Sequence, residues 1–205
     1  MPRLVLACAI FTALLVTPVL GAQALDGWGA YKFGLSPDAA RAVPGMTFGP
    51  YAAKNLWNEN KGAMGAKKEP LLYGEPYAFN LFFDSNEKLN EITLENEIKS
   101  SQSGCEKTFL TLLAQLEKPY GGFSAVNPQR KRNDSDTPPT SLEWRAQGAS
   151  HYEFAAVSFA DDYAFVWKAR KTAGGNYVDM SATWSAKPDD PSAPCITTID
   201  FRGRG

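Results

Sequence analysis

The chain has 205 residues, a formal net charge of −1, 44% hydrophobic residues and 12% aromatic residues. These fractions are typical of a folded globular protein and exclude an intrinsically disordered one. A charge so close to zero gives no strong electrostatic field, so we expect no nucleic-acid partner.

The first residues have the pattern of a secretory signal peptide. Arg3 precedes an apolar run from Leu4 to Val16, and Pro18 and the triplet Ala22-Gln23-Ala24 follow it. This order predicts a signal peptide over residues 1–24, cleaved after Ala24, and a periplasmic or secreted protein. A retained N-terminal anchor is the alternative. No later stretch reaches the ~20 apolar residues of a spanning helix, so we expect no membrane span after cleavage.

The cysteines predict one disulfide. Cleavage would remove Cys8 and leave Cys105 and Cys195 in a compartment where disulfides persist. Two buried free thiols are the alternative. With only these two thiols and a single histidine, His151, a closed zinc site is not supported.

The N-terminal part predicts one short helix. Ser36 is a suitable N-cap, and Pro37 suits the first position of a helix that runs to about Val43. Pro44 and Gly45 end this helix. Residues 46–56 contain at most one weak strand.

Residues 58–76 are rich in glycine and proline and are predicted to be a long loop. Its tip around residues 62–68 has little to bury, whereas Leu71, Leu72 and Tyr73 would anchor its base. A mobile tip of this kind could close over a partner, and a tolerated insertion is the alternative.

The stretch from Asn80 to Glu97, NLFFDSNEKLNEITLENE, predicts a hairpin and not a calcium loop. Counted from Asp84, the fifth and sixth positions are Lys88 and Leu89, where a calcium loop needs an oxygen ligand and a glycine. Leu89 is out of phase with the strand that follows, so a β-bulge is expected. The face opposite the apolar residues is predicted to be solvated and carries Glu91, Glu95 and Glu97.

A strong amphipathic helix follows. Ser103 and Glu106 would form its capping box, and Pro119 and Gly121 would end it. Its apolar stripe comprises Cys105, Phe109, Leu112, Leu113 and Leu116. The polar residues 124–140, including Arg130-Lys131-Arg132 with Asp134 and Asp136, predict an exposed connection.

The C-terminal part predicts an antiparallel meander, because short apolar-polar runs alternate with turn residues. The expected strands are residues 141–147, 151–159, 163–170, 177–184 and 195–201. The predicted fold class is therefore α+β: an antiparallel sheet, made of this meander and the earlier hairpin, with one short and one long helix packed on one face. Residues 25–205 would form a single domain, or two subdomains that meet near residues 122–140.

No catalytic residue, cofactor site or metal site is predicted. His151 opens a strand without candidate partners, and Asp161-Asp162 lies at a predicted turn where adjacent acids serve the turn itself. Exposed aromatic and apolar side chains could contact a partner instead. The predicted contacts are Met64, Leu71, Leu72, Tyr73, Trp144 and Trp167.

Three stretches, YKFGLSPDAARAVPG, FNLFFDSNEKLNEITLE and CEKTFLTLLAQLEKPYG, resemble small exported bacterial envelope proteins of unknown function. More distantly, the order of elements is similar to the β-lactamase-inhibitor-protein-like and small outer-membrane assembly lipoprotein group. That resemblance implies a helix layer on an antiparallel sheet and a role in protein binding. The chain lacks the lipidated cysteine of the assembly lipoproteins, and no functional residue carries over.

These observations together predict a non-catalytic binding module for a protein or glycan of the cell envelope. The alternative is a carboxylate-dependent hydrolase of envelope polysaccharide, which needs two acids facing one cleft.

Overall fold

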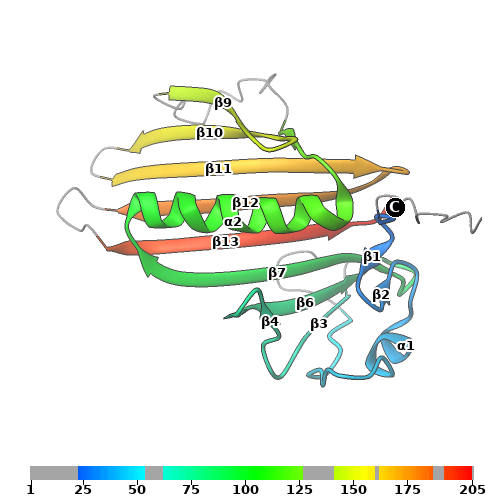
Figure 1. Cartoon of the computed structure of the whole chain (residues 1–205). Helices are drawn as coiled ribbons and strands as arrows, with labels where there is room; N and C mark the ends of the chain where they lie inside the picture. The colour runs from blue at the N-terminus through cyan, green and yellow to red at the C-terminus, as the bar shows by residue number, and fades with distance from the viewer. Residues whose placement is uncertain (1–22, 54–61, 127–140, 160–161, 187–191, 205) are drawn as a thin grey trace, which may run out of the picture.

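The structure, a computed structural model, describes residues 23–53, 62–126, 141–159, 162–186 and 192–204. Most of the expected signal peptide, the basic triplet at residues 130–132 and the side chains of Asp161 and Asp162 lie outside these residues. The described chain folds as mostly antiparallel sheet with two helices, which confirms the α+β class (Figure 1).

One large sheet contains nine strands in the order β3-β6-β7-β13-β12-β11-β10-β9, and β8 also pairs with β11. All pairings between the described strands of this sheet are antiparallel. The strands are β3 (Gly62–Gly65), β6 (Ala78–Phe83), β7 (Leu89–Ser100), β8 (Ser124–Ala125), β9 (Ser141–Gln147), β10 (Ser150–Phe159), β11 (Asp162–Ala173), β12 (Asn176–Ala186) and β13 (Ala193–Arg202). β13 lies between β12 and β7, so the last strand joins the expected hairpin to the expected meander.

The expected hairpin between β6 and β7 is confirmed, including its bulge. The register between these strands shifts between Phe82 and Phe83, where Leu89 pairs out of phase. In the turn, one oxygen of Asp84 accepts hydrogen bonds from the backbone N–H groups of Asn86 and Lys88. The aspartate therefore stabilises the turn itself.

The N-terminal segment contains β1 (Gly27–Trp28), β2 (Tyr31–Lys32) and α1 (Pro37–Arg41). As predicted, Ser36 caps α1, because its side chain accepts a hydrogen bond from the backbone of Ala39.

The prediction of one long loop over residues 58–76 is wrong from Gly62 onward. Residues 62–65 form β3, which pairs with β6, and β4 (Leu71–Leu72) pairs with β5 (Glu75–Pro76). The predicted mobile tip is thus part of the main sheet. A Cβ atom on Gly62 would lie 2.1 Å from the hydroxyl oxygen of Tyr51, so this glycine allows close approach and does not indicate a loop.

The long helix α2 (Gln102–Tyr120) begins earlier than predicted. Its N-cap is Ser101, whose hydroxyl accepts a hydrogen bond from the N–H of Gly104. The expected capping box of Ser103 and Glu106 does not form, because the Glu106 carboxylate binds Arg145 at 2.7 Å instead. The predicted apolar stripe is correct, and the helix ends at Gly121 with φ of 77°.

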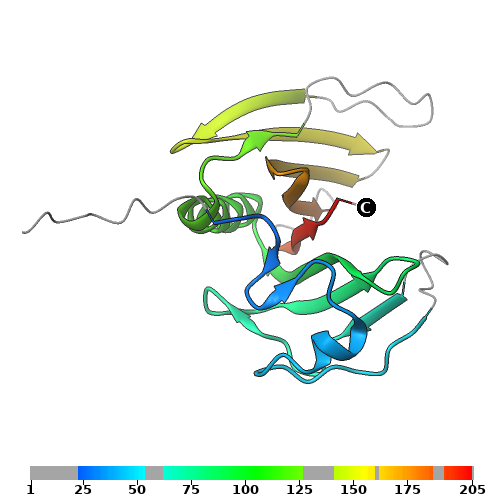
Figure 2. The same ribbon diagram turned by 90° about the vertical axis from the view of Figure 1, so that its right-hand side faces the viewer.

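The core lies between α2 and one face of the sheet. α2 runs along β12 and β13 (Figures 1 and 2). At the other end of this face, the rings of Tyr31 and Phe48 pack on Phe79 of β6, with centroids 5.2 and 5.9 Å apart. The predicted bridge between Cys105 of α2 and Cys195 of β13 is present, and both cysteines are fully buried.

Candidate functional site

Two of the predicted partner contacts are wrong, because they belong to the core. Met64 is only 2% exposed, since β3 directs it to the inner face of the sheet, and Trp167 is 0% exposed. Trp167 pairs with Ala182 across β11 and β12, and its ring lies 5.5 Å from that of Phe154. Neither side chain can contact a partner in this structure.

Three further predicted contacts lie together at the turn between β4 and β5. Leu71 is 73% exposed and Tyr73 is 47% exposed, whereas Leu72 packs against the core. The φ angles of Tyr73 and Gly74 are 54° and 95°, as a tight hairpin turn requires. Burial, with smaller electrostatic contributions from Tyr73 and Asp26, raises the pKa of Tyr120 at the end of α2 to about 12.

Trp144 is exposed on the other side of the molecule, on what we call the open face: the face of β9 to β13 opposite α2. Trp144 is 46% exposed, and its partner in β10 is Glu153. Figure 2 shows α2 on one side of β12 and β13 and no described helix over them on the other side. Of the six predicted contacts, only Trp144 lies on this face.

An apolar row crosses the open face one position away from Trp144. Its members are direct partners on five adjacent strands, and Leu142 and Ile196 at its two ends are exposed. The row consists of Leu142, Ala155, Val166, Thr183 and Ile196, of which Thr183 is polar and Ala155 is only 7% exposed. Exposed apolar side chains such as those at its two ends can contribute to a contact surface.

Beside this row, the open face carries a polar cluster, which sequence reasoning missed. Its members come from β7, β11, β12 and β13 and lie on adjacent positions of the sheet. The polar cluster consists of Glu91, Thr93, Arg170, Tyr177, Asp179, Asp200 and Arg202.

In one half of the cluster, Arg170 donates two hydrogen bonds to Asp179, from Nε and Nη2. The guanidinium carbon of Arg170 also lies 4.5 Å from the centre of the Tyr177 ring. A bidentate pair of this kind fixes both side chains, because two parallel hydrogen bonds allow a single geometry. The hydrogen bonds that Asp179 accepts raise the pKa of Arg170 above its ordinary value.

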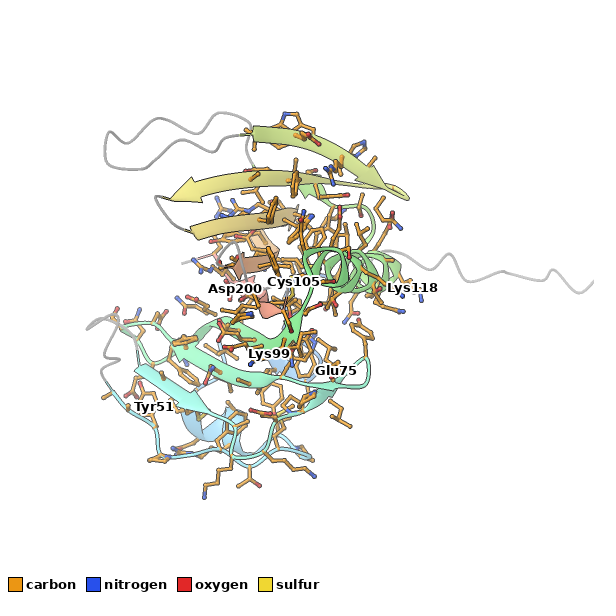
Figure 3. The ribbon with its side chains drawn as sticks, turned by 90° about the vertical axis from the view of Figure 1, so that its left-hand side faces the viewer. Tyr51, Glu75, Lys99, Cys105, Lys118 and Asp200 are labelled. Carbon is orange, nitrogen blue, oxygen red and sulfur yellow. A yellow bond between two sulfur atoms is a disulfide. The ribbon has the colours of Figure 1, made fainter. Side chains whose placement is uncertain are left out.

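In the other half, Thr93 donates a hydrogen bond of 2.7 Å to Asp200. Arg202 lies 3.5 Å from the Asp200 carboxylate and 3.4 Å from that of Glu91. Burial raises the pKa of Asp200, and the Thr93 hydrogen bond and the charge of Arg202 only partly oppose this. Asp200 pairs directly with Asp179 across β12 and β13, so these two acidic residues are neighbours on the open face. Figure 3 labels Asp200, on the side of the sheet away from α2.

The remaining candidates from the sequence do not join this cluster. His151 is exposed, and its backbone N–H donates to the carbonyl of Phe123. Within the described ranges, no three His, Cys, Asp or Glu side chains are grouped so that they could hold a metal ion. Neither described helix is long and apolar enough to cross a membrane.

The described residues thus form an α+β chain in which α2 lies on one face of β12 and β13. Comparisons with known protein families, with curated proteins and with solved structures find no match for it.

Proposed function

We propose that this chain is an exported, non-catalytic binding protein that contacts a protein or glycan of the cell envelope through its open face. The observation that carries the proposal is the group of exposed apolar side chains on that face: Leu142, Trp144 and Ile196. Leu142 and Trp144 are neighbours on β9, whereas Ile196 lies four strands away on β13. A large exposed aromatic side chain is a common centre of binding energy. The more distant resemblance, to the β-lactamase-inhibitor-protein-like and assembly lipoprotein group with roles in protein binding, points in the same direction.

The proposal assumes that both helices pack on the same face of the sheet, which leaves the other face free for a partner. The support is that Ala40 of α1 and Phe109 of α2 are both fully buried in one core cluster. It also takes residues 1–24 to be a cleaved signal peptide, because of the charge, apolar core and small residues described above.

The polar cluster would flank the apolar contact and give it specificity. Its charged groups are already paired with one another, so a partner would not have to neutralise an isolated buried charge. A polar rim around an apolar centre is the usual composition of a protein interface.

The proposal can be tested with Trp144→Ser and Ile196→Ser, which remove exposed apolar groups from the open face. The immobilised full chain would be exposed separately to solubilised envelope proteins and to purified envelope polysaccharide. We expect the wild type to retain an envelope protein or the polysaccharide, and each variant to retain at least about tenfold less of that same material. Leu71→Ser, a more exposed apolar residue on the separate β4–β5 hairpin, is the control and should bind normally. Equal retention by all four proteins would refute the role of the open face.

The carboxylate hydrolase is the second candidate, and the opposition of Asp179 and Asp200 is the observation in its favour. A raised pKa on one acid of such a pair suits a general acid. Against it, Arg170 holds both oxygens of Asp179, so that carboxylate is not free to act as a base. Release of reducing ends from envelope polysaccharide by the wild type, lost in Asp200→Asn, would favour the hydrolase over the binding protein.

A further inference from the structure

The two ends of the main sheet differ in their edges. At the β3 end, residues 48–52 cover the edge: Ala52 and Ala63 exchange two backbone hydrogen bonds, of 2.9 and 2.8 Å, and the N–H of Gly49 donates to Gly65. At the other end lies β9, which pairs with β10 and with no other described strand. An open edge presents unpaired backbone groups that can accept another strand.

The sequence of β9, SLEWRAQ, is complementary to itself when two copies run antiparallel. With Trp144 opposite Trp144 of a second copy, Glu143 faces Arg145 and Leu142 faces Ala146. Opposite charges in directly facing positions stabilise a strand pair, and like charges destabilise it. Centring the pair on Glu143 or on Arg145 places like charges opposite each other, so the charges select the register centred on Trp144.

Both faces of β9 have side chains available for such a pair. Toward α2, Arg145 binds Glu106 and Glu143, yet the Arg145 and Glu143 side chains remain 34% and 54% exposed. Toward the open face, Leu142 and Trp144 are exposed. Directly facing side chains in antiparallel strands have Cβ atoms about 5 Å apart, so the two Trp144 rings would cover one another.

We propose that a second copy of this chain pairs with the first along β9, antiparallel and centred on Trp144, to form a two-fold symmetric dimer with one continuous sheet. The same patch meets itself, as a two-fold interface requires. Seven residues of strand bury little area, so the dimer is reversible. The dimer would cover Trp144 and so compete with the proposed envelope partner for that side chain, and its test needs no such partner.

The register can be tested by cysteine cross-linking in the full chain, because the native cysteines are already joined in a buried bridge. Directly facing positions suit a disulfide. We expect Trp144→Cys to form a linked dimer under mild oxidation, and Leu142→Cys to form one only when mixed with Ala146→Cys. Ile196→Cys, exposed on the same face but remote from the edge, is the control. Cross-linking of Leu142→Cys alone as efficient as that of Trp144→Cys would overturn the register.

A second measurement keeps Trp144 in place. Glu143→Arg makes β9 positive, and Arg145→Glu makes it negative, with Glu106→Gln added to the latter to avoid repulsion from α2. By sedimentation equilibrium, each variant alone should self-associate at least about tenfold more weakly than the wild type, and an equimolar mixture should recover association. A wild type that stays monomeric at every concentration, or variants that self-associate as it does, would overturn the dimer.

Discussion

Removing the bridge between Cys105 and Cys195 should cost a large part of the stability of the fold. The bridge closes a segment of 90 residues. On the chain-entropy model, a cross-link that closes a loop of that size raises the free energy of the unfolded state by about 4.6 kcal/mol and so stabilises the fold. Since domains of this size are stable by only about 5–15 kcal/mol, we expect the double variant Cys105→Ala with Cys195→Ala to unfold at much lower urea concentration. Alanine avoids burying a new polar group.

The assay is urea unfolding monitored by tryptophan fluorescence, in which the variant is compared with the oxidised wild type. The reduced wild type, which lacks the bridge but keeps both cysteine side chains, is the control. The m-value should rise in the variant, because its unfolded chain is no longer cross-linked and exposes more surface. A loss of less than about 1 kcal/mol, together with an unchanged m-value, would show that the bridge does not constrain the unfolded chain as reasoned.

Three further changes test local features. Ser101→Ala should lower the free energy of unfolding by about 1 kcal/mol, and Ser103→Ala should do so much less, because Ser101 caps α2; equal effects in urea unfolding would contradict this cap. Gly27→Ala should cost roughly 3 kcal/mol or more, because its Cβ would lie 2.0 Å from the carbonyl oxygen of Tyr31. Gly29→Ala, with φ of 57° and open space, is the control at about 1 kcal/mol by thermal unfolding. The raised pKa of Asp200 means that its contribution to stability is present at low pH and lost as pH rises through the folded-state pKa. The free energy of unfolding of Asp200→Asn, relative to that of the wild type, should therefore increase between about pH 3 and pH 7. If this difference between the two proteins does not change with pH, the pKa of Asp200 is not raised.

The strands that alternate strongly were predictable from the sequence. The five C-terminal strands agree closely with the expected ranges, because period-two alternation and Gly-Gly or Gly-Ala turns determine them locally. The bulge between β6 and β7 was also predictable, because Leu89 is out of phase with the alternation of its strand and an extra residue must be accommodated in the strand pairing.

Features that depend on distant partners were not predictable. β3 has the sequence Gly-Ala-Met-Gly, which carries no alternating pattern, and it is a strand only because β6 pairs with it. The sequence favours Ser103 as the cap of α2, because Glu106 three residues later would complete a capping box. Glu106 instead binds Arg145, which lies 39 residues away in the chain, and Ser101 is the cap.

The polar cluster was missed for a related reason. Arg170, Asp179 and Asp200 each look like an ordinary solvated position on an alternating strand. They meet only because β13 pairs with β12 in one register, which the alternation within each strand does not specify. Trp144 is exposed, whereas Trp167 has the same residue type and alternation but is buried facing α2.

The position of β13 has a consequence for biosynthesis. β7 and β12 leave the ribosome before the strand that must lie between them, so neither can complete its hydrogen bonding until β13 is made. Until then the chain consists of two partial sheets with open inner edges, and such edges promote aggregation. Contacts between β13 and β7 span about a hundred residues, which makes this closing step slow. Nascent chains that stop short of residue 193 should therefore need a chaperone, whereas chains extended past residue 202 can close the sheet.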